Sequence, residues 1–213
     1  MGRETDKLFL TIAGQPLAAH TWRRFDGAPF IDEIILVVRD GRQGEFAALA
    51  AQYHFAKPFR IVGGGKERQD SVWQGLQHLA PAAEIVVIQD AARPCTSLAL
   101  IRATIVAARQ DGAAVAAQPV TDTIKLSDDG RVISRHLDRS LLWAVQTPQT
   151  FRVGIIRRAL AKVREKGLQV TDDTAACECV GQPVRLVLGT EPNPKVTVPD
   201  DVPYVEMLLK HSS

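Results

Sequence analysis

The stretch Glu84-Ile-Val-Val-Ile-Gln-Asp-Ala-Ala-Arg-Pro94 determines the fold class of this chain. Its unbroken, β-branched apolar run is typical of a strand buried on both faces within a parallel sheet. Asp90 and Arg93 then follow at the carboxyl end of the strand, where open α/β sheets bind ligands. A carboxylate at that place can hold Mg²⁺, and a guanidinium can bind phosphate or carboxylate. The residues alone equally allow a strand-end Asp that caps the next helix, with Arg93 in solvent.

Segments with strand and helix patterns alternate outward from this run. The order βαβα predicts an α/β fold, with a mostly parallel, twisted sheet flanked by helices and right-handed crossovers. A chain of 213 residues is long enough for one such domain, with or without an appendage. We predict strands at 34–38, 59–62, 84–89, 113–117, 184–188 and 195–198, and helices at 42–54, 67–79, 97–110, 153–166 and 200–210.

The composition disfavours several classes of protein. A formal net charge of +2 is too small for general nucleic-acid binding, although local basic clusters could hold phosphorylated small molecules. Cys95, Cys177 and Cys179 lack the spacing of a zinc or redox motif, so we expect reduced thiols. No apolar run reaches the ~18 residues of a membrane span, and the first residues lack an apolar signal core. We therefore expect a cytoplasmic protein that binds neither membrane nor nucleic acid.

The segment 119–142 interrupts the α/β order. Polar and apolar residues alternate over 121–127 and 131–137, around a turn rich in Asp and Gly at 128–130. This pattern is typical of a β-hairpin. Because both faces are polar and an isolated ribbon is marginal in water, we expect a projecting arm that packs on a second copy of the chain. A solvent-exposed excursion without a partner is the alternative.

A glycine-rich loop, Val62-Gly-Gly-Gly-Lys-Glu-Arg-Gln-Asp-Ser-Val72, joins a predicted strand to a predicted helix. Its glycines allow the backbone to approach a ligand, and the first N–H groups of the helix favour an anion or a nucleoside carbonyl. The loop lacks the spacing of a Walker A motif, and by itself it is more often a tight turn. Ser71 either donates to a ligand or bonds back to its own backbone.

Hydroxyl and cationic residues suited to a phosphate pocket are scattered along the chain. Arg and Lys supply charge, and Thr hydroxyls supply directed hydrogen bonds. Such residues are also common on solvated surfaces, so by themselves they define no site. The candidates are Lys7, Thr123, Arg139, Thr147, Thr171 and Lys195.

The order and spacing of the motifs supply a further constraint. Along the chain stand Lys7-x-x-Leu10-x-Ile12-x-Gly14-x-Pro16-Leu17, Gly63-Gly64 with Glu67-Arg68-x-x-Ser71-Val72, Asp90-Ala-Ala-Arg-Pro94, Pro119-Val-x-Asp122-Thr123-Ile-Lys125, Asp138-Arg139-x-x-Leu142-Trp143, Gln146-Thr147-Pro148-Gln149, Thr171-Asp172-Asp173 and Asn193-x-Lys195-Val-Thr197. This series closely resembles the 2-C-methyl-D-erythritol 4-phosphate cytidylyltransferase family over nearly the whole chain. Ribitol-5-phosphate cytidylyltransferases share much of the pattern, so the same chemistry on that acceptor is the alternative.

The resemblance implies a Rossmann-like nucleotidyltransferase in which a sugar-alcohol phosphate attacks the α-phosphorus of CTP and pyrophosphate leaves. It implies catalytic roles for Lys7, Asp90 and Lys195, with Asp90 as the Mg²⁺ ligand. In such a family the arm reaches across a homodimer, so Thr123 and Arg139 would serve the partner's site. By the same resemblance, the CTP-binding residues are Gly63, Gly64, Arg68, Ser71, Ala91 and Arg93, and the acceptor-binding residues are Thr123, Arg139, Thr147, Thr171 and Lys195.

The sequence departs from the family pattern at two places, its first residues and Asp173. The family begins with a strand and a glycine-rich loop that carries an arginine, and Met1-Gly2 aligns with the end of that loop. We therefore expect that the first strand and most of the loop lie upstream of Met1. A truncated, non-catalytic nucleotide-binding remnant is the alternative. Asp173 stands where many relatives carry Glu, and it could still cap a helix.

Overall fold

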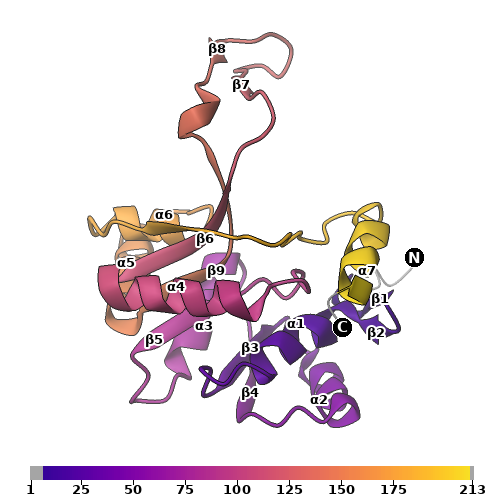
Figure 1. The fold of residues 1–213 in the computed structure, drawn as a ribbon. Coiled ribbons are helices and arrows are strands. Elements are labelled where there is room, and N and C mark those ends of the chain that lie inside the picture. Colours follow the sequence, from indigo (N-terminus) through magenta and orange to yellow (C-terminus); the bar gives the residue numbers. More distant parts are fainter. Residues whose placement is uncertain (1–6, 212–213) are drawn as a thin grey trace.

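Helices cover both faces of a mixed β-sheet in the computed structural model, which describes residues 7–211 (Figure 1). The main sheet has the strand order β10-β6-β9-β5. β10 (Arg185–Leu188) runs parallel to β6 (Ala113–Pro119), whereas β9 (Trp143–Arg152) is antiparallel to both β6 and β5 (Ile85–Ile88). A second, parallel pair consists of β3 (Ile34–Val38) and β4 (Phe59–Gly63).

The helices form two layers. α1 and α4 pack on one face of the sheet, and α3, α5 and α6 pack on the other. Within the described residues, no helix is both long enough and apolar enough to cross a lipid bilayer. The remaining elements are η1 (Lys7–Phe9), β1 (Thr11–Ile12), β2 (Gln15–Pro16), α1 (Leu17–Asp26), α2 (Gln43–Tyr53), α3 (Arg68–Gln77), α4 (Leu98–Asp111), β7 (Lys125–Leu126), β8 (Arg135–His136), η2 (Arg139–Leu141), α5 (Val153–Glu165), α6 (Asp173–Glu178) and α7 (Asp201–His211).

The apolar run Ile85–Ile88 forms β5, and helices from opposite layers bury its two faces. Ile85 and Val87 contact the cluster formed by α1 and α4, whereas Val86 and Ile88 contact the cluster formed by α3, α5 and α6. Successive side chains of a strand point to opposite faces, so a strand covered on both sides requires apolar residues throughout. The predicted strand is confirmed, but its residues are half-buried and its hydrogen-bonded partner β9 runs antiparallel to it, whereas a parallel neighbour was predicted.

The predicted helices are all present, with ends that differ from expectation by one or two residues. The strand expected at 195–198 is wrong, because this segment is irregular. Its backbone bonds go elsewhere: the Val196 N–H donates to the Ala92 carbonyl (2.9 Å), and the Thr197 N–H donates to the Asp201 carboxylate (2.6 Å). The sequence patterns also did not predict α1 or β9.

The sheet is divided between β3 and β5 in the part of the chain that is described. β3 pairs with β4 alone, and β5 pairs with β9 alone. Ile34 of β3 nevertheless contacts the same apolar cluster as Ile85 and Val87 of β5. The two halves are thus joined by side chains. The segment expected upstream of Met1 lies outside the described residues and stays a prediction.

Residues 120–142 form an arm that projects from the ends of β6 and β9 (Figure 1). At its tip, the Asp129 carboxylate accepts hydrogen bonds from the N–H groups of Arg131 (2.8 Å) and Val132 (3.1 Å), and Gly130 supplies the positive φ of +71°. The projecting hairpin agrees with expectation, but β7 and β8 have only two residues each. Longer pairing would gain little, because neither face of the ribbon packs against the body.

Candidate active site

Asp90 lies just after β5, among three cationic side chains. The Lys195 Nζ is 2.9 Å from the Asp90 carboxylate, and the Nε atoms of Arg68 and Arg93 are each 3.7 Å from it. These cations come from the start of α3, from the turn after β5, and from the irregular segment before α7. Segments far apart in sequence therefore converge at the carboxyl end of β5.

Asp90 does not cap the following helix. Ser97 is the N-cap of α4, and its Oγ accepts a hydrogen bond from the Leu100 N–H (3.3 Å). The guanidinium of Arg93 is also not in solvent, since only 11% of its side chain is exposed. Of the two interpretations that the sequence left open for this turn, the ligand site is the one that the geometry supports.

The charge of Asp90 is strongly compensated. Burial raises the pKa of this carboxyl, but the hydrogen bond and charge of Lys195, together with the charges of Arg68 and Arg93, outweigh burial and hold the pKa below its ordinary value. Asp90 is therefore ionised at neutral pH. Three cations beside one carboxylate leave an excess of positive charge, which suits an anionic substrate.

The buried side chain of Asn193 fixes the geometry of the turn. Its Nδ2 donates to the Thr147 carbonyl (2.8 Å), and its Oδ1 accepts from the Thr96 hydroxyl (2.9 Å). The backbone carbonyl of Asn193 accepts from Arg93 (2.6 Å), and the Thr147 hydroxyl accepts from the Asp90 N–H (3.1 Å). Asp90 and Arg93 are thus both held by one connected network. Only 4% of Asn193 is exposed, so these bonds are shielded from water.

Arg68 joins Asp90 to a second carboxylate, that of Asp173. The Arg68 Nη1 is 2.7 Å from the Asp173 Oδ2, and only 1% of Asp173 is exposed. Burial raises the pKa of Asp173, although the charge and hydrogen bond of Arg68 oppose this. The expectation that Asp173 caps a helix is wrong, because Asp172 caps α6 by accepting from the Ala175 N–H (2.9 Å).

The glycine-rich loop packs closely on the first turn of α3. A Cβ on Gly64 would lie 2.8 Å from the Ser71 Oγ, and one on Gly63 would overlap the Asp40 carboxylate. A side chain at Gly64 would require Ser71 to shift, and one at Gly63 would require the exposed Asp40 carboxylate to move. The Ser71 Oγ accepts from the Gly65 N–H (3.1 Å) and lies within bonding distance of the Glu67 carbonyl (3.3 Å). Ser71 thus bonds back to its own loop.

Lys7 reaches the Asp90 turn indirectly. Its Nζ donates to the Val196 carbonyl (3.1 Å), and the Val196 N–H in turn donates to the Ala92 carbonyl (2.9 Å). The neighbouring carbonyl, that of Ala91, accepts from the Thr21 hydroxyl of α1 (2.7 Å). Lys7 is therefore linked to this turn through Val196, and Ala91 is part of the turn.

Two predicted acceptor-binding residues lie far from Asp90 within one protomer. Thr123 and Arg139 are on the arm, where Arg139 donates to the Thr121 carbonyl (2.6 Å) (Figure 1). Thr171 is exposed and stands just before the Asp172 cap of α6. The predicted residues that the structure brings together around Asp90 are Arg68, Arg93, Thr147 and Lys195.

Sequence reasoning assigned no role to Asn193 and misassigned Asp173. A signal for Asn193 exists in Pro192-Asn193-Pro194, because an amide held between two prolines indicates a fixed, extended backbone. Asp173 carries no comparable signal, since its partner Arg68 is 105 positions away in sequence.

Within the described chain, Asp90 does not belong to a group of side chains that could hold a metal ion without further ligands. Over residues 7–211, no group of three or more His, Cys, Asp or Glu side chains is arranged to hold a metal ion. Mg²⁺ in nucleotide enzymes is commonly held by one or two carboxylates together with substrate phosphates and water. The residues present therefore fit a Mg²⁺ ion that arrives with a triphosphate.

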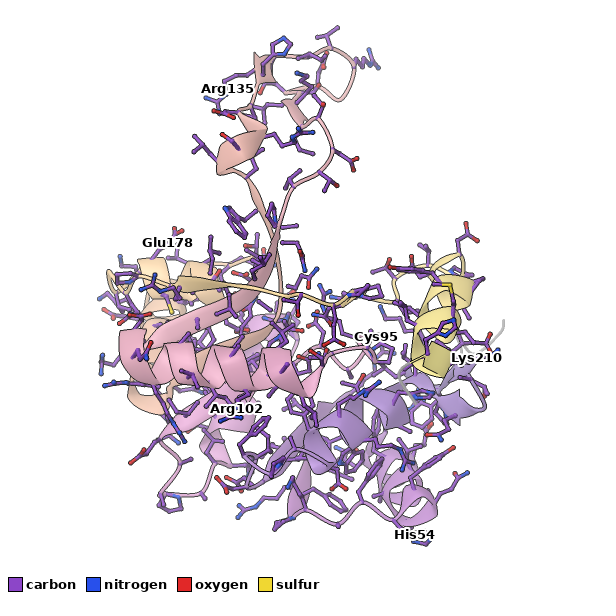
Figure 2. The ribbon with its side chains drawn as sticks, in the orientation of Figure 1. His54, Cys95, Arg102, Arg135, Glu178 and Lys210 are labelled. Atoms are coloured by element: carbon purple, nitrogen blue, oxygen red, sulfur yellow. The ribbon has the colours of Figure 1, made fainter. Side chains whose placement is uncertain are left out.

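The cysteines have no part in this chemistry. Cys95, on the loop before α4 (Figure 2), and Cys177 in α6 are free and buried. Burial raises the pKa of the Cys95 thiol to about 11 and that of Cys177 to about 12, so both are protonated at neutral pH.

Comparison with known proteins identifies the family. The chain matches the family described as 2-C-methyl-D-erythritol 4-phosphate cytidylyltransferase over residues 1–211. The chain belongs to this family. A protein of that name from Pelotomaculum thermopropionicum is 40% identical over 211 residues, which cover 99% of this chain and 89% of the relative. Its counterpart from Desulforamulus reducens is 42% identical over 211 residues, covering 99% and 90%.

Solved structures of the 2-C-methyl-D-erythritol 4-phosphate cytidylyltransferase family share the fold. The crystal structure of 4-diphosphocytidyl-2C-methyl-D-erythritol synthase from Anaerococcus prevotii gives a TM-score of 0.87 at 29% identity, covering 95% of this chain and 93% of that one. The cytidylyltransferase from Thermus thermophilus gives 0.79 at 32% identity, covering 96% and 94%. The resemblance and the α/β nucleotidyltransferase fold predicted from sequence are therefore both confirmed.

Arg68→Ala should destabilise the fold by about 3 kcal/mol at neutral pH, because it leaves the Asp173 charge buried and unpaired. An acid whose pKa is raised by folding lowers stability as pH rises above the ordinary carboxyl range, so this loss should shrink toward pH ~4. Urea unfolding at both pH values measures the effect. Arg68→Ala combined with Asp173→Asn is the matched control and should recover most of the loss. Equal losses at the two pH values would contradict the assignment.

Proposed function

We propose that the Asp90 site transfers a cytidylyl group from CTP to 2-C-methyl-D-erythritol 4-phosphate, a step of non-mevalonate isoprenoid biosynthesis. This proposal rests mainly on the cluster of Lys195, Arg68 and Arg93 around the ionised Asp90 carboxylate at the carboxyl end of β5. Membership of the cytidylyltransferase family gives that cluster its substrates. None of the relatives reported above is named for ribitol phosphate, and no observation favours that acceptor.

The reaction is an in-line displacement at phosphorus. A phosphate oxygen of the acceptor forms a bond to the α-phosphorus of CTP, and the bond from that phosphorus to the bridging oxygen breaks, so that pyrophosphate leaves. Positioning and charge neutralisation supply most of the catalysis in such reactions. Lys7 and Lys195 supply cationic groups at the turn where negative charge develops. Asp90 would hold Mg²⁺, which neutralises triphosphate charge when bound.

The surroundings of Asp90 are arranged before substrate arrives. Arg93 is fixed by the Asn193 carbonyl, and Arg68 is fixed by the Asp173 carboxylate. Such groups need little reorganisation when charge develops on the substrate. The Ser71 hydroxyl already bonds within its own loop, and the Gly64 N–H donates to the Val38 carbonyl (2.7 Å). We therefore assign recognition of the cytosine to the loop around Gly63 and Gly64 and to neither of these two donors.

The arm suits contact with a second copy of the chain. It carries large apolar side chains that are strongly exposed in the protomer: Val132 (67%), Ile133 (57%) and Leu141 (76%). Apolar side chains gathered on a projecting segment are typical of an interface. In a homodimer, the arm of one protomer would carry Thr123 and Arg139 to the acceptor side of its partner's site.

The 213-residue chain should bind CTP in a Mg²⁺-dependent manner and release pyrophosphate with 2-C-methyl-D-erythritol 4-phosphate. Calorimetric titration measures binding, and a coupled pyrophosphate assay measures turnover with each acceptor. A preference of about tenfold or more for ribitol 5-phosphate, equivalent to ~1.4 kcal/mol, would overturn the proposed acceptor. An absence of CTP binding would instead favour the non-catalytic remnant.

Lys7→Ala and Asp90→Ala should each lower turnover by about 10²-fold or more, since each removes a charge that acts on the reacting phosphates. The thermal unfolding transition checks that the fold is retained. Lys166→Ala and Asp32→Ala, both at exposed positions outside the site, are the matched controls and should leave turnover unchanged. Near-normal turnover in either site variant would refute its assigned role.

Mixing Arg139→Ala protein with Asp90→Ala protein should restore activity. Each variant alone has two defective sites, but a mixed dimer in which arms serve the partner has one site with both Asp90 and Arg139 intact. Turnover should therefore rise well above that of either variant, toward a fraction of the native value set by the mixed dimers. Arg139→Ala alone should mainly raise KM for the acceptor. A mixture no more active than its components would place Arg139 outside the partner's site.

A further inference from the structure

A cavity distinct from the Asp90 site lies beside α1. Its volume is about 580 Å³. Its walls are the turn between β1 and β2, one face of α1, the start of α4 and the last turns of α7, whose Lys210 is labelled in Figure 2. None of the residues that line it belongs to the group around Asp90. The volume falls within the range of about 300–1,000 Å³ that is common for small-molecule sites.

The cavity is lined by more positive than negative charge. α1 contributes His20, Arg23 and Arg24, which lie on one face because they are three and four positions apart. The acidic side chain of the lining, Glu206, is paired with Lys210 at 3.3 Å. Among residues 7–211, no carboxylate forms an ion pair with Arg23 or Arg24. The Arg23 guanidinium lies over the rings of Tyr53 (5.7 Å) and Phe55 (5.8 Å) and donates to the Gln15 Oε1 (3.4 Å), so neither arginine of the lining is neutralised by a carboxylate of the described chain.

The same positive charge surrounds His20. Burial lowers the pKa of His20, and the charges of Arg23 and Arg24 lower it further, against a hydrogen bond between its Nε2 and the Ile12 carbonyl (2.7 Å). From α7 the cavity is lined by Glu206 and Lys210, which form an ion pair with one another. An anion bound beside the two arginines would reverse part of this shift.

We propose that this cavity binds a small phosphorylated anion between Arg23 and Arg24. A guanidinium presents a planar fork of donors that matches two phosphate oxygens. The remaining walls suit a compact ligand with a short apolar part, because Ala13, Leu98 and Leu209 line the cavity beside the charged groups.

Helix α1 also holds the catalytic turn. The Thr21 hydroxyl donates to the Ala91 carbonyl (2.7 Å), and the Arg24 Nε donates weakly to the Pro94 carbonyl (3.4 Å). An anion that binds Arg24 therefore acts on a residue that also contacts the turn carrying Asp90.

Titration with inorganic phosphate at constant ionic strength, followed through the His20 imidazole resonance by NMR, tests this site. His20→Gln assigns the resonance. We expect a saturable shift and a higher His20 pKa with phosphate bound. Arg23→Gln and Arg24→Gln should each weaken binding by about tenfold, as expected for loss of a charge-assisted contact. Arg102→Gln, on the exposed side of α4 (Figure 2), should leave the response unchanged.

The design separates this cavity from the Asp90 site. Lys195→Ala alters the Asp90 site but should preserve the His20 response to phosphate. The proposal is overturned if the His20 resonance does not shift saturably, if chloride at matched ionic strength produces the same shift, or if the arginine variants respond like the native chain. A loss of the response in Lys195→Ala or Arg102→Gln would also overturn it. Failure of the CTP assay has no bearing on any of these outcomes.

Discussion

The neutralisation of Asp90 is the constraint on which the rest of the site depends. A carboxylate at the end of a buried strand is stable as an anion only if cations or hydrogen-bond donors compensate for lost hydration. Here the compensation comes from Lys195, Arg68 and Arg93. Each cation must in turn be held in place, which accounts for the two buried groups behind them. Asn193 fixes Arg93, and Asp173 fixes Arg68.

The scaffold serves this arrangement through three separate segments. Arg68 is the first residue of α3, after the glycine-rich loop. The Asp90 turn follows β5, and Lys195 lies in the irregular segment before α7. The bond from the Val196 N–H to the Ala92 carbonyl ties the last two segments together. This bond replaces the strand pairing that the sequence pattern suggested for 195–198. The exchange makes physical sense, because a strand would direct its donors to a neighbouring strand and away from the turn.

Local pattern predicted the scaffold well. The amphipathic helices were recognisable because burial on one face leaves a periodic pattern of apolar residues. The β5 strand was recognisable because burial on both faces leaves an unbroken apolar run. β9 was missed because its buried residues include Thr147, Gln149 and Thr150, whose polar groups are satisfied by bonds that only the folded chain provides. The same holds for the site: the Asp90 turn was visible in one stretch, whereas the pairing of Arg68 with Asp173 depends on chain topology.

The division of the sheet has a consequence for how the Asp90 turn is held in place. No backbone ladder runs from β3 to β5 among the described residues, where the two halves are joined by apolar contacts of Ile34, Ile85 and Val87 and by hydrogen bonds such as that from the Ala80 N–H to the Glu33 carboxylate (2.7 Å). The Asp90 turn is thus held from both halves, because Thr21 of α1 donates to the Ala91 carbonyl (2.7 Å) and the Thr147 hydroxyl of β9 accepts from the Asp90 N–H (3.1 Å), so a shift of one half against the other would displace the site.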